Sequence, residues 1–111
     1  MTYADLRRQL EEYNWDDGFA LPSSLARNPL CDLAMALELF YLGDGYGWMV
    51  SGGRRALPDW AAFIEPLYTD IAAGRYPVGP GRFQNPLTKV QRYRLRRQGI
   101  PEVFLQDLPS A

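Results

Sequence analysis

Carboxylates and cations are the side chains of this sequence whose types and spacing could carry out chemistry. Asp16 and Asp17 are adjacent acids in the stretch of residues 14–18, Asn-Trp-Asp-Asp-Gly. General acid–base or metal chemistry would need both carboxylates to converge on one site. Because neighbouring side chains diverge in most backbone conformations, we expect this pair to cap a helix or brace a turn. A contact with a partner protein is the alternative.

Residues 43–47 (Gly-Asp-Gly-Tyr-Gly) form a second candidate because glycine-rich loops can hold phosphate. A phosphate loop follows a strand and opens a helix, and a calcium loop alternates oxygen ligands and ends in a glutamate. The sequence offers neither context. We therefore interpret residues 43–53 as a glycine- and aromatic-rich loop, with a short extended piece at 47–50. Tyr46 and Trp48 are expected to be exposed in it and to anchor a partner.

The third candidate is a basic run at residues 89–97, which contains one lysine and four arginines. On a helix, Lys89, Arg92 and Arg96 share one face, which could contact the phosphates of a nucleic acid or a nucleotide. A solvated face that pairs with the acidic first half of the chain is the simpler interpretation. Arginines near the C-terminus of a helix also interact favourably with its dipole.

The residue counts exclude several kinds of site. The 111 residues include no histidine and one cysteine, Cys31. Nucleophiles that depend on a histidine base, His-liganded metals, intramolecular disulfides and Cys-rich metal sites are therefore excluded. Cys31 stands at the start of an apolar helical pattern, so we expect a buried thiol rather than a nucleophile. We expect a protein that is not an enzyme and that holds neither cofactor nor metal.

The charge is near neutral in total and uneven along the chain. A net charge of −1 argues against a simple nucleic-acid binder, which usually has a strongly basic domain. Residues 1–50 hold eight acids and three bases, a balance of −5, whereas residues 51–111 hold five acids and nine bases, a balance of +4. Either the halves neutralise each other within one fold, or the acidic half faces a basic partner.

The sequence also shows no recognisable membrane span or signal peptide. No apolar run approaches the roughly 18 residues of a membrane span, and residues 1–8 do not read as a signal peptide. Together with the lone cysteine, these features predict a cytoplasmic protein without membrane contact.

Hydrophobic periodicity predicts an all-α fold, a single domain over residues 1–111 built as a small bundle of four to five helices. Thr2 and Asp5 form an approximate capping box, and Asn85 followed by Pro86 is typical of a helix start. Pro66 lies inside a strong amphipathic pattern and is expected to kink it. The longer helices are expected at 4–13, 30–42, 58–73 and 86–98, and shorter ones at 22–27 and 101–108.

With these elements placed, one stretch resembles a known family. The stretch consists of Tyr13-Asn14-Trp15-Asp16-Asp17-Gly18-Phe19, then Leu21-Pro22, then Asn28-Pro29-Leu30-Cys31-Asp32-Leu33-Ala34-Met35-Ala36-Leu37. It resembles a bacterial domain family of unknown function, the DUF4274-type family, well over residues 10–42 and loosely elsewhere. The resemblance implies a small, mostly helical, cytoplasmic bacterial protein, of a type often encoded beside polymorphic toxins as immunity proteins. We expect Trp15 and Phe19 to pack onto the core from either side of the turn.

The sequence thus favours a non-catalytic binding protein, an immunity protein that neutralises a cognate toxin by protein–protein contact. An acidic first half could block a basic active-site cleft. The alternative is a small domain that binds nucleic acid or nucleotide phosphate through Lys89, Arg92 and Arg96, although the net charge argues against nucleic acid. The candidate contacts with the toxin are Glu11, Glu12, Asp16, Asp17, Asp44, Tyr46 and Trp48.

Overall fold

The structure is a computed structural model that describes residues 1–54 and 56–109. In this part of the chain it contains six α-helices, two short 3-10 helices and no strand, which confirms an all-α fold with slightly more helices than expected. The helices follow one another as α1 (Tyr3–Glu12), η1 (Trp15–Asp17), α2 (Ala20–Arg27), α3 (Leu33–Leu42), α4 (Gly45–Ser51), α5 (Pro58–Ala72), α6 (Lys89–Arg97) and η2 (Glu102–Leu105).

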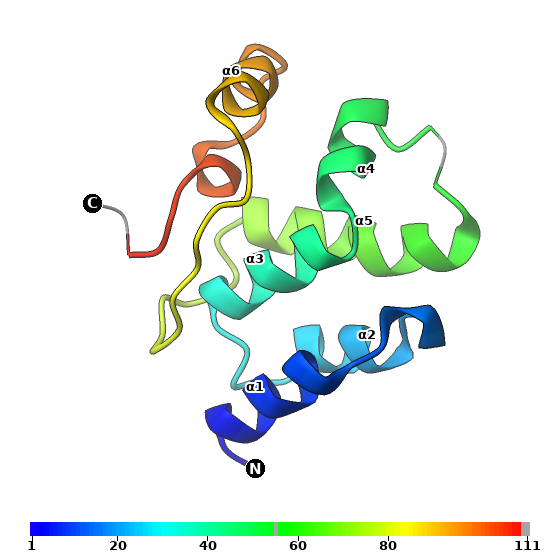
Figure 1. Cartoon of the computed structure of the whole chain (residues 1–111), viewed down its shortest axis with the longest axis vertical. Coiled ribbons are helices and arrows are strands. Elements are labelled where there is room, and N and C mark those ends of the chain that lie inside the picture. The colour runs from blue at the N-terminus through cyan, green and yellow to red at the C-terminus, as the bar shows by residue number, and fades with distance from the viewer. Residues whose placement is uncertain (55, 110–111) are drawn as a thin grey trace.

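Helix α3 is the centre of the core. Six of its ten residues are buried, and Leu37, Leu39 and Phe40 have no exposed surface. A helix that is apolar on nearly all sides is stable only when other elements surround it. Helices α2, α4 and α5 pack against α3, while α6 and η2 lie at the opposite end of the molecule from α1 and α2 (Figure 1).

Aromatic rings attach the outer segments to this centre. Trp15 and Phe19 both contact Phe63 of α5, with ring centroids 6.0 Å and 5.1 Å away. This arrangement confirms that the two rings pack onto the core from either side of the turn. At the other end, Tyr68 of α5 stacks on Phe104 of η2 at 4.7 Å. Such aromatic pairs contribute about 0.5–1.5 kcal/mol each beyond the area that they bury.

Helix α4 corrects the expectation of a loop with an extended piece at 47–50. The side chain of Asp44 accepts a hydrogen bond from the N–H of Gly47 at 3.1 Å and so caps the first turn. A Cβ atom on Gly45 would lie 2.2 Å from the ring of Phe40. Glycine here allows the backbone to approach the core closely, so the glycines permit a packed helix instead of a flexible loop.

Two helix starts lie later in the chain than expected. Helix α3 begins at Leu33 rather than at residue 30, because the side chain of Asn28 accepts from the N–H of Leu30 and holds a turn before the helix. Helix α6 begins at Lys89 rather than at Pro86. Its cap is Thr88, which forms a capping box with Gln91.

The Asn85 side chain serves a different purpose from the expected cap. It is buried and joins the extended segment before α6 to η2, donating to the carbonyl of Phe104 at 2.8 Å and accepting from the N–H of Leu87 at 2.9 Å. The helix expected at 101–108 is the single turn η2. Helix α5 continues through Pro66 to Ala72, and the capping box of Thr2 with Asp5 on α1 is confirmed.

Candidate functional site

Two open depressions in the surface meet at the indole of Trp60. The first has a volume of about 820 Å³ and lies beside α4, and the second has a volume of about 960 Å³ and lies between η1, the start of α2 and the start of α5. The first is lined by Asp44, Tyr46, Gly47, Met49, Val50, Ser51, Gly52, Arg54, Trp60 and Gln98. The second is lined by Asp17, Gly18, Phe19, Ala20, Ser23, Arg27, Leu57, Pro58, Asp59, Trp60, Ala62 and Phe63.

Trp60 is held firmly between these depressions. Its Nε1 donates to the carbonyl of Gly43 at 2.7 Å, which ties the first turn of α5 to the end of α3. Leu57 precedes α5 at its N-cap position and is 72% exposed. A fixed indole beside an exposed leucine is an apolar surface that water covers in the free protein.

Charged side chains of both signs border the depressions. Asp17 and Asp59 lie on the second depression with Arg27, and Asp44 lies on the first with Arg54. The combination of apolar floor and charged border is typical of surfaces that bind another protein. In the described part of the chain, the acids and the cysteine are not grouped in any set of three that could hold a metal ion.

Asp44 has an unusual backbone conformation at this surface. Its φ of 60° and ψ of 44° place it in the left-handed region, which costs most residues about 1–2 kcal/mol. Aspartate tolerates this region better than most residues because its short side chain bonds to nearby backbone, here to the N–H of Gly47. The carboxylate is exposed and remains able to accept from a partner.

Of the predicted contact residues, Asp17, Asp44 and Tyr46 line the two depressions. The expectation of an exposed Trp48 is wrong, because its ring is half-buried and packs on Tyr68 at a centroid distance of 4.9 Å. Tyr46 is also half-buried. Asp16 is exposed on η1 but does not line either depression.

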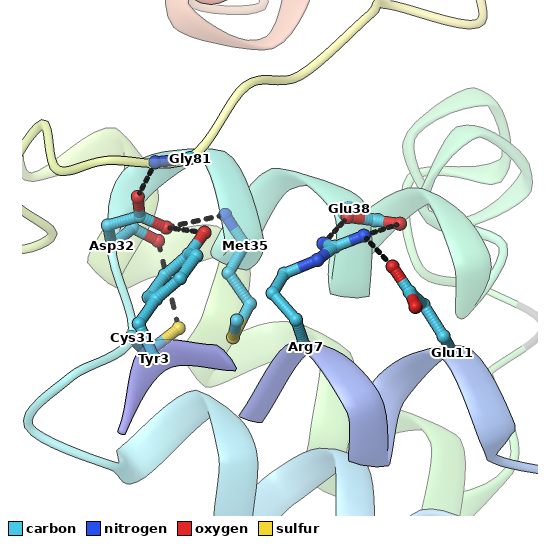
Figure 2. A network of polar contacts seen from close by, with 8 residues as sticks. All are labelled: Tyr3, Arg7, Glu11, Cys31, Asp32, Met35, Glu38 and Gly81. Atoms are coloured by element: carbon cyan, nitrogen blue, oxygen red, sulfur yellow. Dashed lines mark hydrogen bonds and ion pairs between the residues drawn. The ribbon is translucent and has the colours of Figure 1, made fainter. Parts of the chain in front are cut away.

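Glu11 and Glu12 lie on α1, and both are exposed. Glu11 accepts from Arg7 at 3.1 Å, and Arg7 also pairs with the half-buried Glu38 of α3 (Figure 2). The hydrogen bond with Glu38 and burial act in opposite directions on Arg7, and the bond dominates, so the pKa of Arg7 is raised. Glu11 thus pairs within α1, and the pair that holds α1 against α3 is Arg7 with Glu38.

Asp32 carries the buried polar network of Figure 2. Its side chain is 2% exposed and accepts from the Tyr3 hydroxyl at 3.0 Å, the Met35 N–H at 2.9 Å and the Gly81 N–H at 2.8 Å. Burial, together with the bond to Asp32, raises the pKa of Tyr3. These three donors satisfy the hydrogen-bond acceptors of the Asp32 carboxylate, whose burial would otherwise destabilise the fold. The motif residue Asp32 is therefore explained by folding.

Cys31 is 3% exposed, as expected for a buried thiol. Burial, and secondarily the charge of Asp32, raises the pKa of Cys31 to about 12. Because the thiolate is the nucleophilic form, this environment keeps the group unreactive.

The features that sequence reasoning missed are Trp60 as a surface residue, exposed Leu57, and Asp59. Trp60 begins the amphipathic pattern around Pro66 and packs against the core, but at the first turn of α5 it is only half-buried. A leucine directly before the Pro58 helix start was the available signal, since that position precedes the packed face.

Comparison with known proteins gives one result. A family model described as Domain of unknown function (DUF4274) matches residues 6–72, which is more than half of the chain. The chain belongs to the DUF4274 family. No curated protein and no solved structure matches it.

The part that matches the DUF4274 model contains almost all of the surface around Trp60. Asp17, Asp44 and Trp60 lie within residues 6–72, whereas Gln98 lies outside it. Helix α6, with the expected phosphate-binding residues, follows the matched part. Within residues 1–54 and 56–109, every helix falls short of the length and apolar character of a membrane span.

The predicted phosphate-binding residues of this DUF4274 protein do not act as one set. Lys89 is exposed, but Arg96 pairs with Glu102 through contacts of 2.6 Å and 3.1 Å. Arg92 is half-buried, with its Nε covered. Because Arg92 is half-buried and Arg96 is paired with Glu102, the three residues differ in how freely they could contact a phosphate.

Proposed function

We propose that this DUF4274 protein is a non-catalytic binding protein, an immunity protein that neutralises a cognate toxin in the cytoplasm by covering it. The observation that carries the proposal is the meeting of two open depressions at Trp60. Because Trp60 lines both, Asp17 and Asp44, which are 27 positions apart in the sequence, border two adjoining depressions.

The shape of this surface supports docking of a protein. The depressions are open and broad; the half-buried Trp60 lines both of them, and the exposed Leu57 lines the second. Tryptophan is among the residues that contribute most to binding when an interface buries them. The Nε1 bond to Gly43 fixes the indole before binding, so little side-chain entropy is lost.

The charges support a partner with basic groups. Among the residues that the structure describes, three carboxylates and two guanidinium groups border the surface, so the partner would meet carboxylates on both depressions. A toxin that acts on a polyanion presents a basic cleft, and carboxylates that face such a cleft accelerate association and exclude the substrate. The two arginines can pair with acids at the border of the same cleft.

Co-expression with the product of the neighbouring gene, which the proposal expects to be a toxin, tests the proposal. We expect the wild-type protein to restore growth and to co-purify with the toxin. Leu57→Ser introduces a favourable N-cap residue for α5 and removes the exposed apolar group, so it should weaken the complex about tenfold or more without unfolding the protein. Asp17→Lys should slow association, most strongly at low salt.

Val78→Ser is the matched control, because Val78 is 76% exposed and lines neither depression. It should bind as the wild type does. Failure of the wild type both to form a complex and to restore growth would contradict the proposal. Equal losses for Leu57→Ser and Val78→Ser would place the contact elsewhere.

A further inference from the structure

Helix α6 has an outward face that differs from the one expected from the sequence. Leu95 is its one buried residue. With 3.6 residues per turn, the side opposite Leu95 carries Val90, Tyr93 and Arg97. Lys89 and Arg94 flank these residues on either side. This set of five residues is called the α6 outer face below.

The α6 outer face combines exposed apolar and aromatic groups with a cation. Val90 is 66% exposed and Tyr93 is 59% exposed. The guanidinium carbon of Arg97 lies 5.9 Å from the Tyr93 ring centroid, and its Nη1 donates to the Tyr93 hydroxyl at 3.2 Å. A shallow depression of about 430 Å³ runs along Val90, Tyr93, Arg94, Arg97 and Gln98.

The cations of this face are free to bind an anion. Helix α6 contains no acidic residue, and Glu102 pairs with Arg96 instead. Across the described residues, Lys89, Arg94 and Arg97 form no ion pair within 4.0 Å. Three unpaired cations on one short helix attract a polyanion even though the whole chain is near neutral.

We propose that the α6 outer face binds single-stranded nucleic acid. A base stacks on Tyr93 or on the Arg97 guanidinium, and neighbouring phosphates contact Lys89, Arg94 and Arg97. Arg94 and Arg97 are three positions apart, so their Cβ atoms lie about 5–6 Å apart and the two cations can contact one backbone, while Lys89 lies further along the helix for a more distant phosphate. The proposed activity goes beyond toxin binding and uses the α6 outer face, whose depression shares Gln98 alone with the lining of the first depression.

Single-stranded nucleic acid fits this face better than an acidic protein does. Unpaired bases expose flat π surfaces, and stacking on an aromatic side chain contributes about 1–3 kcal/mol per base. An acidic peptide would use the cations but would gain little from an exposed tyrosine ring. The shallow depression also suits a flexible strand more than the large contact area of a stable protein complex.

The test is a fluorescence anisotropy titration of the full chain with a labelled oligouridine of about 12 nucleotides, a length within the range that such sites cover. For three phosphate contacts, the plot of log affinity against log salt should have a slope of about −2. Arg94→Ala with Arg97→Ala should reduce the slope to about −0.7. Tyr93→Ala should weaken binding roughly fivefold to 150-fold and leave the slope unchanged.

Arg8→Ala with Arg75→Ala is the matched control, since it removes the same charge from exposed positions outside α6. This variant should bind as the wild type does, and circular dichroism should show that all variants are folded. Three results overturn the proposal: no binding at low salt, equal losses in the two double variants, or equally effective displacement of the oligouridine by polyglutamate of the same charge.

Discussion

Gly81 donates its backbone N–H to the carboxylate of Asp32 at 2.8 Å, across 49 positions of sequence. The bond joins the start of α3 to the segment between α5 and α6. Leu33 strengthens the junction, because its N–H donates to the carbonyl of Pro77 at 2.8 Å. Gly81 lies beyond the part that matches the family model. One buried carboxylate thus connects the matched part of the fold with the part that follows.

Gly81→Ala should destabilise the fold by about 1–3 kcal/mol, as overpacking of a tight site does. A Cβ atom at this position would lie 2.2 Å from the Tyr3 hydroxyl oxygen and 2.7 Å from Oδ2 of Asp32. Urea unfolding measures the loss. Adding Tyr3→Phe removes the atom nearest to the new Cβ. The double variant should therefore lose less unfolding free energy than the two single variants lose together. Strict additivity would show that the contact is not strained as described.

Arg7→Gln should cost more stability than Glu11→Gln, although the two residues share an ion pair. Arg7 and Glu38 both have side chains less than one-third exposed, so removing the guanidinium leaves a half-buried carboxylate without its partner. We expect a loss of about 1–2 kcal/mol for Arg7→Gln and below about 0.5 kcal/mol for the exposed Glu11. Thermal unfolding of the two variants compares them, and equal losses would contradict the geometry.

Asp44→Ala should destabilise the protein by about 1–3 kcal/mol, because it removes the cap of α4 and places alanine in the left-handed region. Asp44→Gly removes the cap but relieves the backbone, so its loss should be a few tenths of a kcal/mol. Asp44→Asn keeps an acceptor for Gly47 and should be nearly neutral. Chemical unfolding ranks the three, and Asp44→Asn then isolates the effect of charge on partner binding.

Cys31 should make the fold less stable as the pH rises above about 9. Burial raises the pKa of Cys31 from 9.0 to about 12, so the folded chain keeps the proton that the unfolded chain releases. The stabilisation is complete below pH 9 and declines toward pH 12, by up to about 1.4 kcal/mol per pH unit. Half-buried tyrosines such as Tyr3, whose pKa is also raised, add a slope of the same sign that is common to both proteins. Unfolding measured between about pH 8 and 9.5 should therefore show a steeper loss of stability in the wild type than in Cys31→Ala.

Local patterns predicted much of the fold. The apolar spacing from Trp60 to Ile71 indicated α5, and the Thr2–Asp5 capping box indicated the start of α1. These features depend on residues within one or two helical turns, so they can be inferred directly from the local sequence. The burial of Cys31 followed in the same way from the apolar pattern around it.

The sequence could not show features that depend on distant partners. Gly45 looked like part of a flexible loop because its contact with Phe40 exists only after α3 and α4 pack. Asn85 was interpreted as a helix cap. Its bond to Phe104 spans 19 positions, so no local pattern in the sequence could indicate it. The surface at Trp60 joins η1, α4 and α5, and no local spacing predicts that meeting.

The close approach of residues 79–81 to Asp32 also limits how this segment can differ between relatives. Residues 79–81 approach Asp32 with a main-chain amide and with glycines whose added Cβ atoms would lie 2.7 Å from Asp32 Cβ at position 79 and 2.7 Å from its Oδ2 at position 81. A main-chain donor demands a fixed position, and the close approach to Asp32 demands glycine at 79 and 81. The residues next to these glycines can be exchanged during divergence, whereas an insertion or deletion would move the amide out of reach. We expect the length of this segment and its two glycines to be preserved more strictly than its other residues.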